Sequence, residues 1–147
     1  MLRANQPDQR LPQALSFVSW SSPASTSSSP PFSPQVARRL WDVFLERVNP
    51  VLRLSFSWTL VQLEQALLDE SKWAALIPGD QALVVAYCYS ASTTTSKEET
   101  VEMFGQPRAA FRHSCRRTCE EALSRCNLLM VKEKSTVKAL TVYIVSH

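Results

Sequence analysis

An unbroken apolar run at residues 82–89 constrains the fold of this chain more than any other feature. With its flanks, the run predicts a helix over residues 81–92 that has almost no polar face. A helix of this kind belongs in the middle of a bundle. A buried strand is the alternative, because periodicity cannot separate the two over so short a run. The 147 residues include only two glycines against nine prolines, which disfavours a β-rich fold built on tight glycine turns.

Further helices are predicted before this run. Ser33 followed by Pro34 predicts a helix start, since serine accepts a backbone N–H and proline suits the first helical position. We expect this helix to end at residues 49–50, Asn-Pro. A second helix is predicted over residues 60–69, with a capping box formed by Thr59 and Gln62.

Capping patterns also divide the chain after residue 78. Asp80 is placed to cap the helix of the apolar run. Ser96 and Glu99 fit a capping box for a short helix, and Gly105 is placed to end it.

Two further segments complete the chain. A long helix is predicted over residues 107–129. Ser135 is placed to cap a final segment over residues 136–147, whose local propensity favours a strand. Residues 1–33 are rich in serine and proline and are expected to form a disordered linker.

The basic residues do not gather into a patch along the sequence. The formal net charge is only +3, and the tightest basic groups are pairs such as Arg38-Arg39. Nucleic-acid surfaces are typically concentrated basic patches, so the charge gives no evidence for DNA binding. No apolar run resembles a secretory signal or reaches the roughly 20 residues of a membrane span. We therefore expect a soluble intracellular protein with reduced cysteines.

Three of the four cysteines, Cys115, Cys119 and Cys126, lie close together, which raises the question of zinc. Structural zinc uses four ligands, usually in two closely spaced pairs. Here all three thiols fall in one predicted helix, and the fourth, Cys88, lies far back in the sequence. At helical spacing the three share a stripe with Ala122, so we expect core packing.

No acid, base or nucleophile can be placed, so an enzyme is not expected. His113 and Cys115 point about 200° apart on a helix, beyond the reach that a nucleophile and its base require. Two isolated glycines cannot form a phosphate-binding loop. The i,i+4 pairs Arg116–Glu120, Arg117–Glu121 and Glu121–Arg125 instead predict a solvated helix face.

The order of these segments is similar to a known family. Residues 34–51, with Leu, Phe and Val-Asn-Pro at helical spacing, resemble the opening of the middle regulatory domain of fungal zinc-cluster transcription factors. Residues 82–94 resemble its central helix. Residues 115–127 resemble its Arg-x-x-Cys-Glu-x-Ala-Leu helix, and residues 136–145 its Thr-Val-x-Ala-Leu-x-x-Tyr helix. The resemblance covers roughly residues 34–147.

The resemblance implies an all-α fold, a partial bundle of about five to six helices over residues 34–147, with the last segment helical. It also implies a nuclear module of transcription regulation that has no enzymatic activity. The family's zinc cluster, six cysteines in two C-x2-C-x6-C groups, is absent from these residues, so no cofactor and no direct DNA binding are expected. The family's domain normally continues past this chain's end, so a truncated domain is expected.

Two alternatives to a regulatory module stay open. The chain is either a free-standing helical protein that pairs with a full-length relative and dampens it, or a non-functional gene fragment. Expected partners are a protein or relative of the same family, or a small-molecule effector, and not a membrane. The residues that we expect to face the core or a partner are Leu40, Trp41, Phe44, Val48, Leu83, Tyr87, Cys115, Cys119, Ala122, Cys126, Leu140 and Tyr143.

Overall fold

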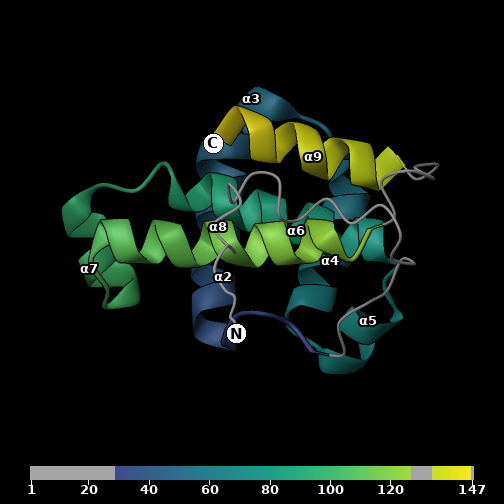
Figure 1. Cartoon of the computed structure of the whole chain (residues 1–147), viewed down its shortest axis with the longest axis horizontal. Helices are drawn as coiled ribbons and strands as arrows, with labels where there is room; N and C mark the ends of the chain where they lie inside the picture. The colour runs from purple at the N-terminus through teal and green to yellow at the C-terminus, as the bar shows by residue number, and fades with distance from the viewer. Residues whose placement is uncertain (1–28, 127–133, 147) are drawn as a thin grey trace, which may run out of the picture.

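The computed structural model describes residues 29–126 and 134–146, and these residues form helices and no strand (Figure 1). The predicted all-α class is therefore confirmed, including a helical last segment. Most of the predicted linker at 1–33 lies outside the described residues. The elements are α2 (Pro34–Val43), the π-helix η1 (Phe44–Val48), α3 (Asn49–Leu52), α4 (Ser57–Leu67), α5 (Glu70–Ala75), α6 (Pro78–Ser92), α7 (Lys97–Phe104), α8 (Arg108–Ser124) and α9 (Lys134–Ser146).

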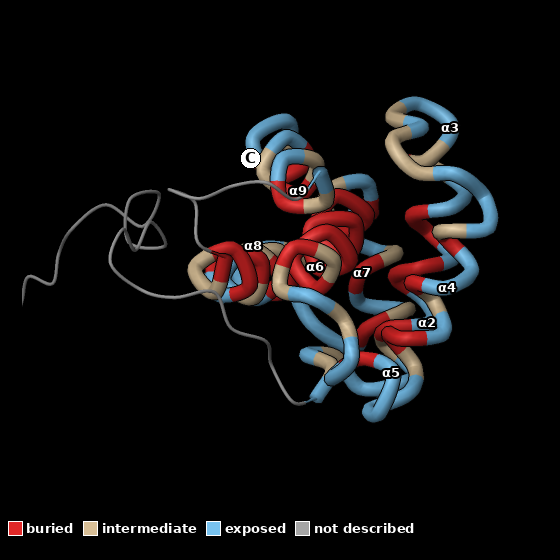
Figure 2. Tube along the Cα trace, turned by 90° about the vertical axis from the view of Figure 1, so that its right-hand side faces the viewer, coloured by how far each residue is buried: buried red, intermediate tan, exposed pale blue. Residues whose placement is uncertain are grey.

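Helix α6 is the centre of the bundle, as its apolar run predicts. Every residue from 81 to 92 is buried, and Figure 2 shows α6 surrounded by the other helices. It packs against α8 and α9 on one side and against α2 and η1 on the other. The rings of Tyr89 and Tyr143 lie 5.9 Å apart near the carboxyl ends of α6 and α9, and Asp80 and Ser135 are hydrogen-bonded near their amino ends. Helices α6 and α9 therefore run parallel.

The first helix begins as predicted, but it does not end at Asn49-Pro50. Ser33 Oγ accepts a hydrogen bond from the Val36 amide at 3.4 Å, with Pro34 at the first helical position. The backbone then passes through η1 directly into α3, which contains Pro50 and ends at Arg53 in the left-handed conformation, φ 47°. A proline inside a helix removes one hydrogen bond and clashes with the preceding turn. The wider π-helical turn before Pro50 accommodates both effects, so the chain continues instead of stopping.

Helix α7 begins and ends where the sequence predicts. Ser96 and Glu99 form the predicted capping box, and Gly105 closes the helix at φ 69°. Glu99 also receives two hydrogen bonds from Arg47 of η1, at 3.0 and 2.6 Å. Arg47 donates in addition to the Thr94 carbonyl at 3.0 Å, so one guanidinium holds the α6–α7 turn against η1.

The Arg47–Glu99 pair predicts a specific acid sensitivity. Hydrogen bonds from Arg47 hold the pKa of Glu99 at about 2, below its ordinary value of 4.5. A carboxyl whose pKa is lowered by folding stabilises the fold above its unfolded pKa, and this contribution is lost as pH falls through the folded pKa. We expect the urea midpoint to fall as pH decreases from 4.5 to about 2. In Glu99→Gln this part of the pH dependence should disappear, whereas in Glu98→Gln, at an exposed neighbour, it should remain.

Three predicted caps are wrong, each because a short polar side chain lies inside its helix instead of before it. Helix α4 begins at Ser57 with Phe56 at the cap position, so Thr59 lies in the first turn. Helix α6 begins at Pro78 with Ile77 at the cap position. Asp80 and Ser135, both placed as caps, instead bond to each other and join the first turns of α6 and α9.

The end of α6 is closed by its own hydroxyl groups. In five residues from Ser90 to Thr95 the side-chain hydroxyl donates to a backbone carbonyl three residues earlier, at 2.6 to 3.1 Å. These bonds give each of the five hydroxyl groups a partner within the helix end itself. The polar end of α6 can therefore be buried, with Ser92 fully enclosed.

Candidate functional site

The structure places the expected core-facing residues almost entirely in the interior. Leu40, Trp41, Phe44, Val48, Leu83, Tyr87, Cys115, Cys119, Ala122, Cys126 and Tyr143 are buried, and Leu140 is half-buried against the core. The largest of these side chains meet in one cluster. The ring centroid of Trp41 lies 4.9 Å from that of Phe44 and 6.2 Å from that of Tyr87. The rings of Phe44 and Tyr87 are stacked, with their centroids 4.2 Å apart. This cluster joins α2 and η1 to α6.

The cysteines are buried, and their thiols are held in the protonated, unreactive form. Burial raises the pKa of Cys115 to about 12 and raises the pKa of Cys88 and Cys119 as well. Since the thiolate is the form that attacks electrophiles and binds metals, these groups are poorly suited to either role. His113 is exposed while Cys115 is buried, so the two cannot act as base and nucleophile. In the described part of the chain, no group of three or more His, Cys, Asp or Glu side chains is arranged to hold a metal.

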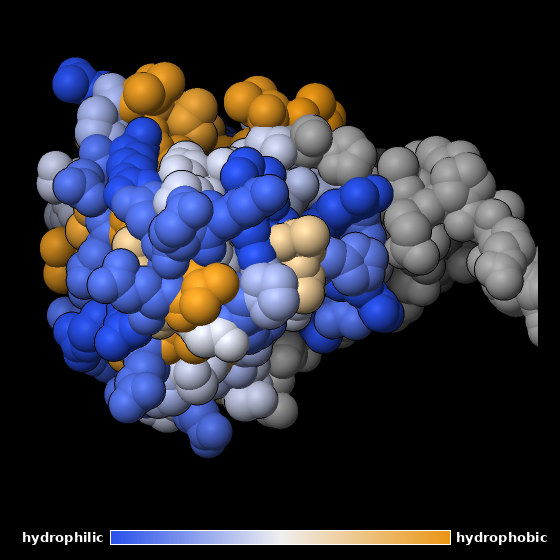
Figure 3. Space-filling view, turned by 90° about the vertical axis from the view of Figure 1, so that its left-hand side faces the viewer, coloured by the Kyte–Doolittle hydropathy of each residue, from blue (hydrophilic) through white to orange (hydrophobic). Residues whose placement is uncertain are grey.

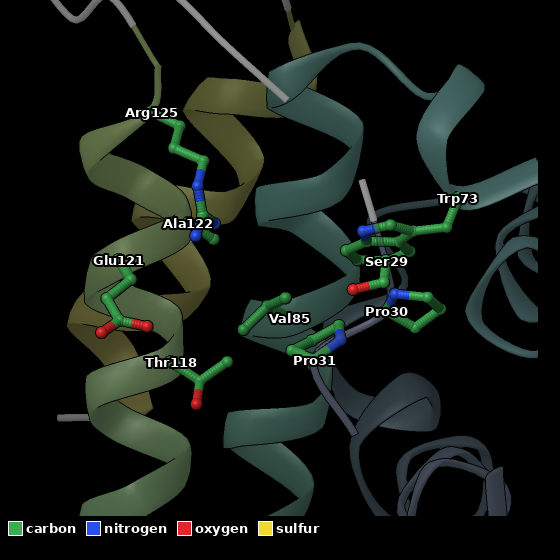
Figure 4. A pocket seen from close by; sticks show the side chains of 9 residues that line it. All are labelled: Ser29, Pro30, Pro31, Trp73, Val85, Thr118, Glu121, Ala122 and Arg125. Atoms are coloured by element: carbon green, nitrogen blue, oxygen red, sulfur yellow. The ribbon is translucent and has the colours of Figure 1, made fainter. Parts of the chain in front are cut away.

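One cavity lies between the start of the described chain, α5, α6 and α8 (Figure 4). It measures about 230 Å³ and is lined by Pro30, Pro31, Trp73, Val85 and Arg125 among others. Pockets for small molecules usually measure about 300–1,000 Å³. The indole nitrogen of Trp73 is buried without a hydrogen-bond partner, but it is too enclosed for a molecule in the cavity to reach it. The cavity gives little support for a small-molecule effector.

Of the i,i+4 pairs predicted to form a solvated face on helix α8, the Arg116–Glu120 pair does not do so, whereas Arg117 and Glu121 are exposed. Glu120 is buried, and its Oε2 accepts hydrogen bonds from Arg116 Nε at 3.2 Å and from the Tyr143 hydroxyl at 2.6 Å. Burial, followed by the bond to Glu120, raises the pKa of Tyr143. Through the Tyr143 hydroxyl, the Arg116–Glu120 pair of α8 is joined to α9, and this part of the solvated-face prediction is wrong.

A second cavity, here called the arginine cavity, opens beside the carboxyl end of α9. It measures about 440 Å³ and is lined by Tyr89, Thr93, Ala109, Arg112, His113, Arg116 and Ser146. Arg112 is fixed in place because it donates to the carbonyls of Ser92 and Thr93 at the end of α6. Arg108, Arg112 and Arg116 follow one another at four-residue spacing, so they share one face of α8.

Large apolar side chains are exposed on two surfaces. The first, the α9 stripe, comprises Val137, Thr141, Ile144 and Val145. The second, the aromatic patch, comprises Val51, Phe56, Trp58 and Val61, with the rings of Phe56 and Trp58 stacked at 6.5 Å. Figure 3 shows hydrophobic residues along the upper edge of the molecule, at the height where Figure 1 places α3 and α9.

The sequence does not by itself predict the arginine cavity, and for the α9 stripe it predicts only that the apolar final helix exposes part of its surface. The signal for the arginines is the four-residue spacing of Arg108, Arg112 and Arg116, which places them on one helix face although they are not neighbours in the sequence. The signal for the stripe was α9 itself, in which apolar residues fall on both faces. A two-sided apolar helix at the surface of a bundle must expose one side.

Comparison with known proteins identifies relatives of the chain. It is 33% identical over 129 residues to the C6 finger domain transcription factor adaR of Aspergillus niger, an alignment that covers 85% of this chain. It is 29% identical over 124 residues, 84% of this chain, to the pyriculol/pyriculariol biosynthesis cluster transcription factor 1 of Pyricularia oryzae. The C6 finger domain transcription factor nscR of Arthroderma gypseum is 29% identical over 115 residues, 76% of this chain. No protein-family profile matches the sequence, and no solved structure matches it significantly.

The homologues of this all-helical chain are fungal transcription factors. More narrowly, adaR and nscR are transcription factors of the C6-finger type, as the family resemblance of the helices implies. Each alignment covers only 16% of the relative's own length, so the chain matches about a sixth of these proteins. Among the described helices, none is both long and apolar enough to cross a bilayer.

Proposed function

We propose that this chain is a helical regulatory module of the C6-finger transcription-factor type, which acts in the nucleus through protein contacts and does not bind DNA by itself. The observation that carries the proposal is the alignment to adaR, because it covers 85% of the chain and so includes most of the bundle. Transcription regulation is the shared role of the relatives, none of which is named as an enzyme.

The 147 residues lack the six-cysteine pattern of a zinc cluster, which supports the proposal that the chain does not bind DNA by itself. The 147 residues contain four cysteines, none before Cys88, whereas a six-cysteine cluster needs two C-x2-C-x6-C groups. The four thiols are buried in the bundle. A structural zinc site contributes the folding energy of its own small domain. The helices share one hydrophobic core, and within residues 29–126 and 134–146 no group of three or more His, Cys, Asp or Glu side chains is arranged to hold a metal.

A tethering experiment tests the regulatory role. The chain is fused to an unrelated DNA-binding domain in a filamentous fungus, and reporter transcription is compared with that of the DNA-binding domain alone. We expect a reproducible change in transcription, and we expect the core variant Trp41→Ala to abolish it because Trp41 is fully buried. Unchanged transcription with a fusion protein that accumulates normally would argue against a regulatory module.

The DNA-binding part of the proposal needs a separate measurement. The purified chain is titrated into a pool of labelled mixed-sequence duplexes, and bound molecules are selected and sequenced. We expect no sequence enrichment and no stable complex, because a net charge of +3 supplies only a weak, salt-sensitive attraction to DNA. Enrichment of a defined sequence would overturn this part alone.

Pairing with a full-length relative is a second candidate function, favoured by the exposed α9 stripe and aromatic patch. Exposed apolar side chains gathered on one surface are typical of protein contacts. Co-expression with a full-length homologue should then reduce its reporter activity and recover both proteins in one complex. An intact reporter signal, with no complex recovered, would exclude this dampening role.

A further inference from the structure

We propose that the arginine cavity is a binding site for a small organic acid, whose carboxylate is held by Arg112 and by the hydroxyl of Tyr89. Residues of α6, α8 and α9 line the cavity together with Thr93, which directly follows α6. A site of this kind goes beyond the proposed function, because it requires neither DNA nor a protein partner. Its test is a binding measurement on the purified chain, so its failure can be told apart from a failure in the transcription experiment.

Tyr89 provides a buried hydroxyl that lacks an acceptor in the described part of the chain. The residue is only 4% exposed, and it lines the cavity. Among the described residues its hydroxyl has no hydrogen-bond partner, whereas the hydroxyls of Tyr87 and Tyr143 each bond to another side chain. Buried polar groups are normally hydrogen-bonded. In the same residues only the indole nitrogens of Trp41 and Trp73 are both fully enclosed and without a partner, so the Tyr89 hydroxyl is not fully enclosed.

Arg112 lines the same cavity and has N–H donors left for a ligand. Its Nε and Nη2 donate to the carbonyls of Ser92 and Thr93, which fixes the plane of the guanidinium. A guanidinium has five N–H donors, and among the described residues the two on Nη1 have no partner. A carboxylate accepts two parallel bonds from such a group. Because the group is already fixed, the entropic cost of binding is low.

The cavity carries positive charge that its lining does not compensate. None of the lining residues is acidic. The charge of Arg116 is balanced by Glu120, to which its Nε donates at 3.2 Å. Arg112 forms no ion pair within the described residues; burial lowers its pKa, and the positive charge of Arg108 lowers the pKa further. A carboxylate beside Arg112 would balance this charge and accept a hydrogen bond from the Tyr89 hydroxyl.

The charge balance and the volume favour a small organic acid over a phosphate. A phosphate group carries about −1.5 to −2 charges at pH 7, more than Arg112 alone balances, and its excess would lie close to the Glu120 carboxylate that binds Arg116. A nucleic-acid backbone needs a row of cations instead of a single cavity. The cavity measures about 440 Å³, within the usual range of about 300–1,000 Å³ for small-molecule pockets. It therefore has room for the organic part of the acid.

The test follows the backbone amide NMR signals of the full 147-residue chain during titration with benzoate at constant ionic strength. We expect saturable shifts of the signals of lining residues such as Thr93 and Ala109, with a Kd of about 1 mM for so small a ligand. Benzamide has the same ring without the charge, and it should bind at least about tenfold more weakly. Phenyl phosphate should also bind more weakly than benzoate, because its charge exceeds that of Arg112.

Matched variants locate the binding site on the chain. Ala109→Phe places a ring in the cavity without removing a hydrogen-bonding side chain and should abolish benzoate binding, whereas Ala110→Phe, at an exposed neighbour outside the lining, should not. Arg112→Gln should weaken binding at least about tenfold, and Arg117→Gln, exposed on the same helix, should leave it unchanged. Tyr89→Phe keeps the ring and should weaken binding at least about threefold. Circular dichroism confirms that each variant is folded before binding is compared.

Several results would overturn the inference. One is the absence of saturable shifts with benzoate, and another is equal binding of benzamide, which would indicate a site for the ring alone. Unchanged benzoate binding in Ala109→Phe, or an equal loss in Ala110→Phe, would place the ligand elsewhere on the chain. If Arg112→Gln does not fold, this pair of alanine variants and Tyr89→Phe still decide the question. Tighter binding of phenyl phosphate than of benzoate would make a phosphate the ligand.

Discussion

Trp41→Ala should strongly destabilise the protein, so that urea concentrations at which the unchanged chain is still folded unfold the variant. Trp41 is completely buried and packs against Phe44 and Tyr87, so its removal leaves a large void where α2 meets α6. Loss of a buried tryptophan costs about 3–5 kcal/mol. Small domains have about 5–15 kcal/mol of stability in total. Urea unfolding followed by circular dichroism should show a strongly lowered midpoint.

Two other tryptophan variants make this result interpretable. Trp58→Ala removes the same side chain from a position that is 64% exposed, and it should change stability by no more than about 0.5 kcal/mol. Trp41→Phe keeps a ring in the cluster and removes the indole N–H, which is buried without a partner. The gain from removing that group offsets part of the lost packing, so we expect a cost below about 2 kcal/mol. Equal losses of stability in Trp41→Ala and Trp58→Ala would contradict the buried position of Trp41.

The second large effect is expected at the contact between α8 and α9. Glu120→Ala should destabilise the chain by about 1–3 kcal/mol, because the carboxylate accepts hydrogen bonds from both Arg116 and Tyr143 inside the bundle. Tyr143→Phe removes one of these bonds and keeps the ring against Tyr89. If the pair acts together, the double variant should be more stable than the sum of the single effects predicts, by about 0.5–3 kcal/mol.

The control for this cycle lies on the same helix. Glu121→Ala removes an exposed carboxylate one residue away and should change stability by less than about 0.5 kcal/mol. Unfolding midpoints in urea provide all of these values. Strict additivity of Glu120→Ala and Tyr143→Phe would mean that the hydroxyl and the carboxylate do not interact in solution.

Much of the fold could be predicted from the sequence where a local pattern is compatible with only one local structure. The apolar run at 82–89 required cover on every side, and α6 is covered on every side. Ser96, Glu99 and Gly105 formed a capping box and a left-handed end because both devices depend only on neighbouring residues. The last segment was harder, since its own propensity favoured a strand. Its resemblance to a known helix gave the right answer.

The remaining features depended on distant contacts. Asp80 and Ser135 looked like caps, but they bond to each other across 55 positions of sequence. Pro50 looked like a stop, but the π-helical turn before it is visible only in three dimensions. Glu120 looked solvated because its i,i+4 arginine is a neighbour along the sequence, whereas the Tyr143 hydroxyl that binds it comes from another helix. For the same reason the arginine cavity escaped notice, since it forms only where α6, α8 and α9 meet.

The hydroxyl groups that close α6 also decide which of its residues can be chemically modified. From sequence alone, residues 90–96, Ser-Ala-Ser-Thr-Thr-Thr-Ser, look like a run of sites for a protein kinase. In the fold, Ser90, Ser92 and Thr95 are buried and their hydroxyl hydrogens are already donated to carbonyls. Within this run, Thr94 and Ser96 are exposed. A phosphate on Ser96 would therefore act directly on the cap of α7, because the Ser96 hydroxyl accepts the Glu99 amide there, and it would place negative charge beside the Glu99 carboxylate that Arg47 binds.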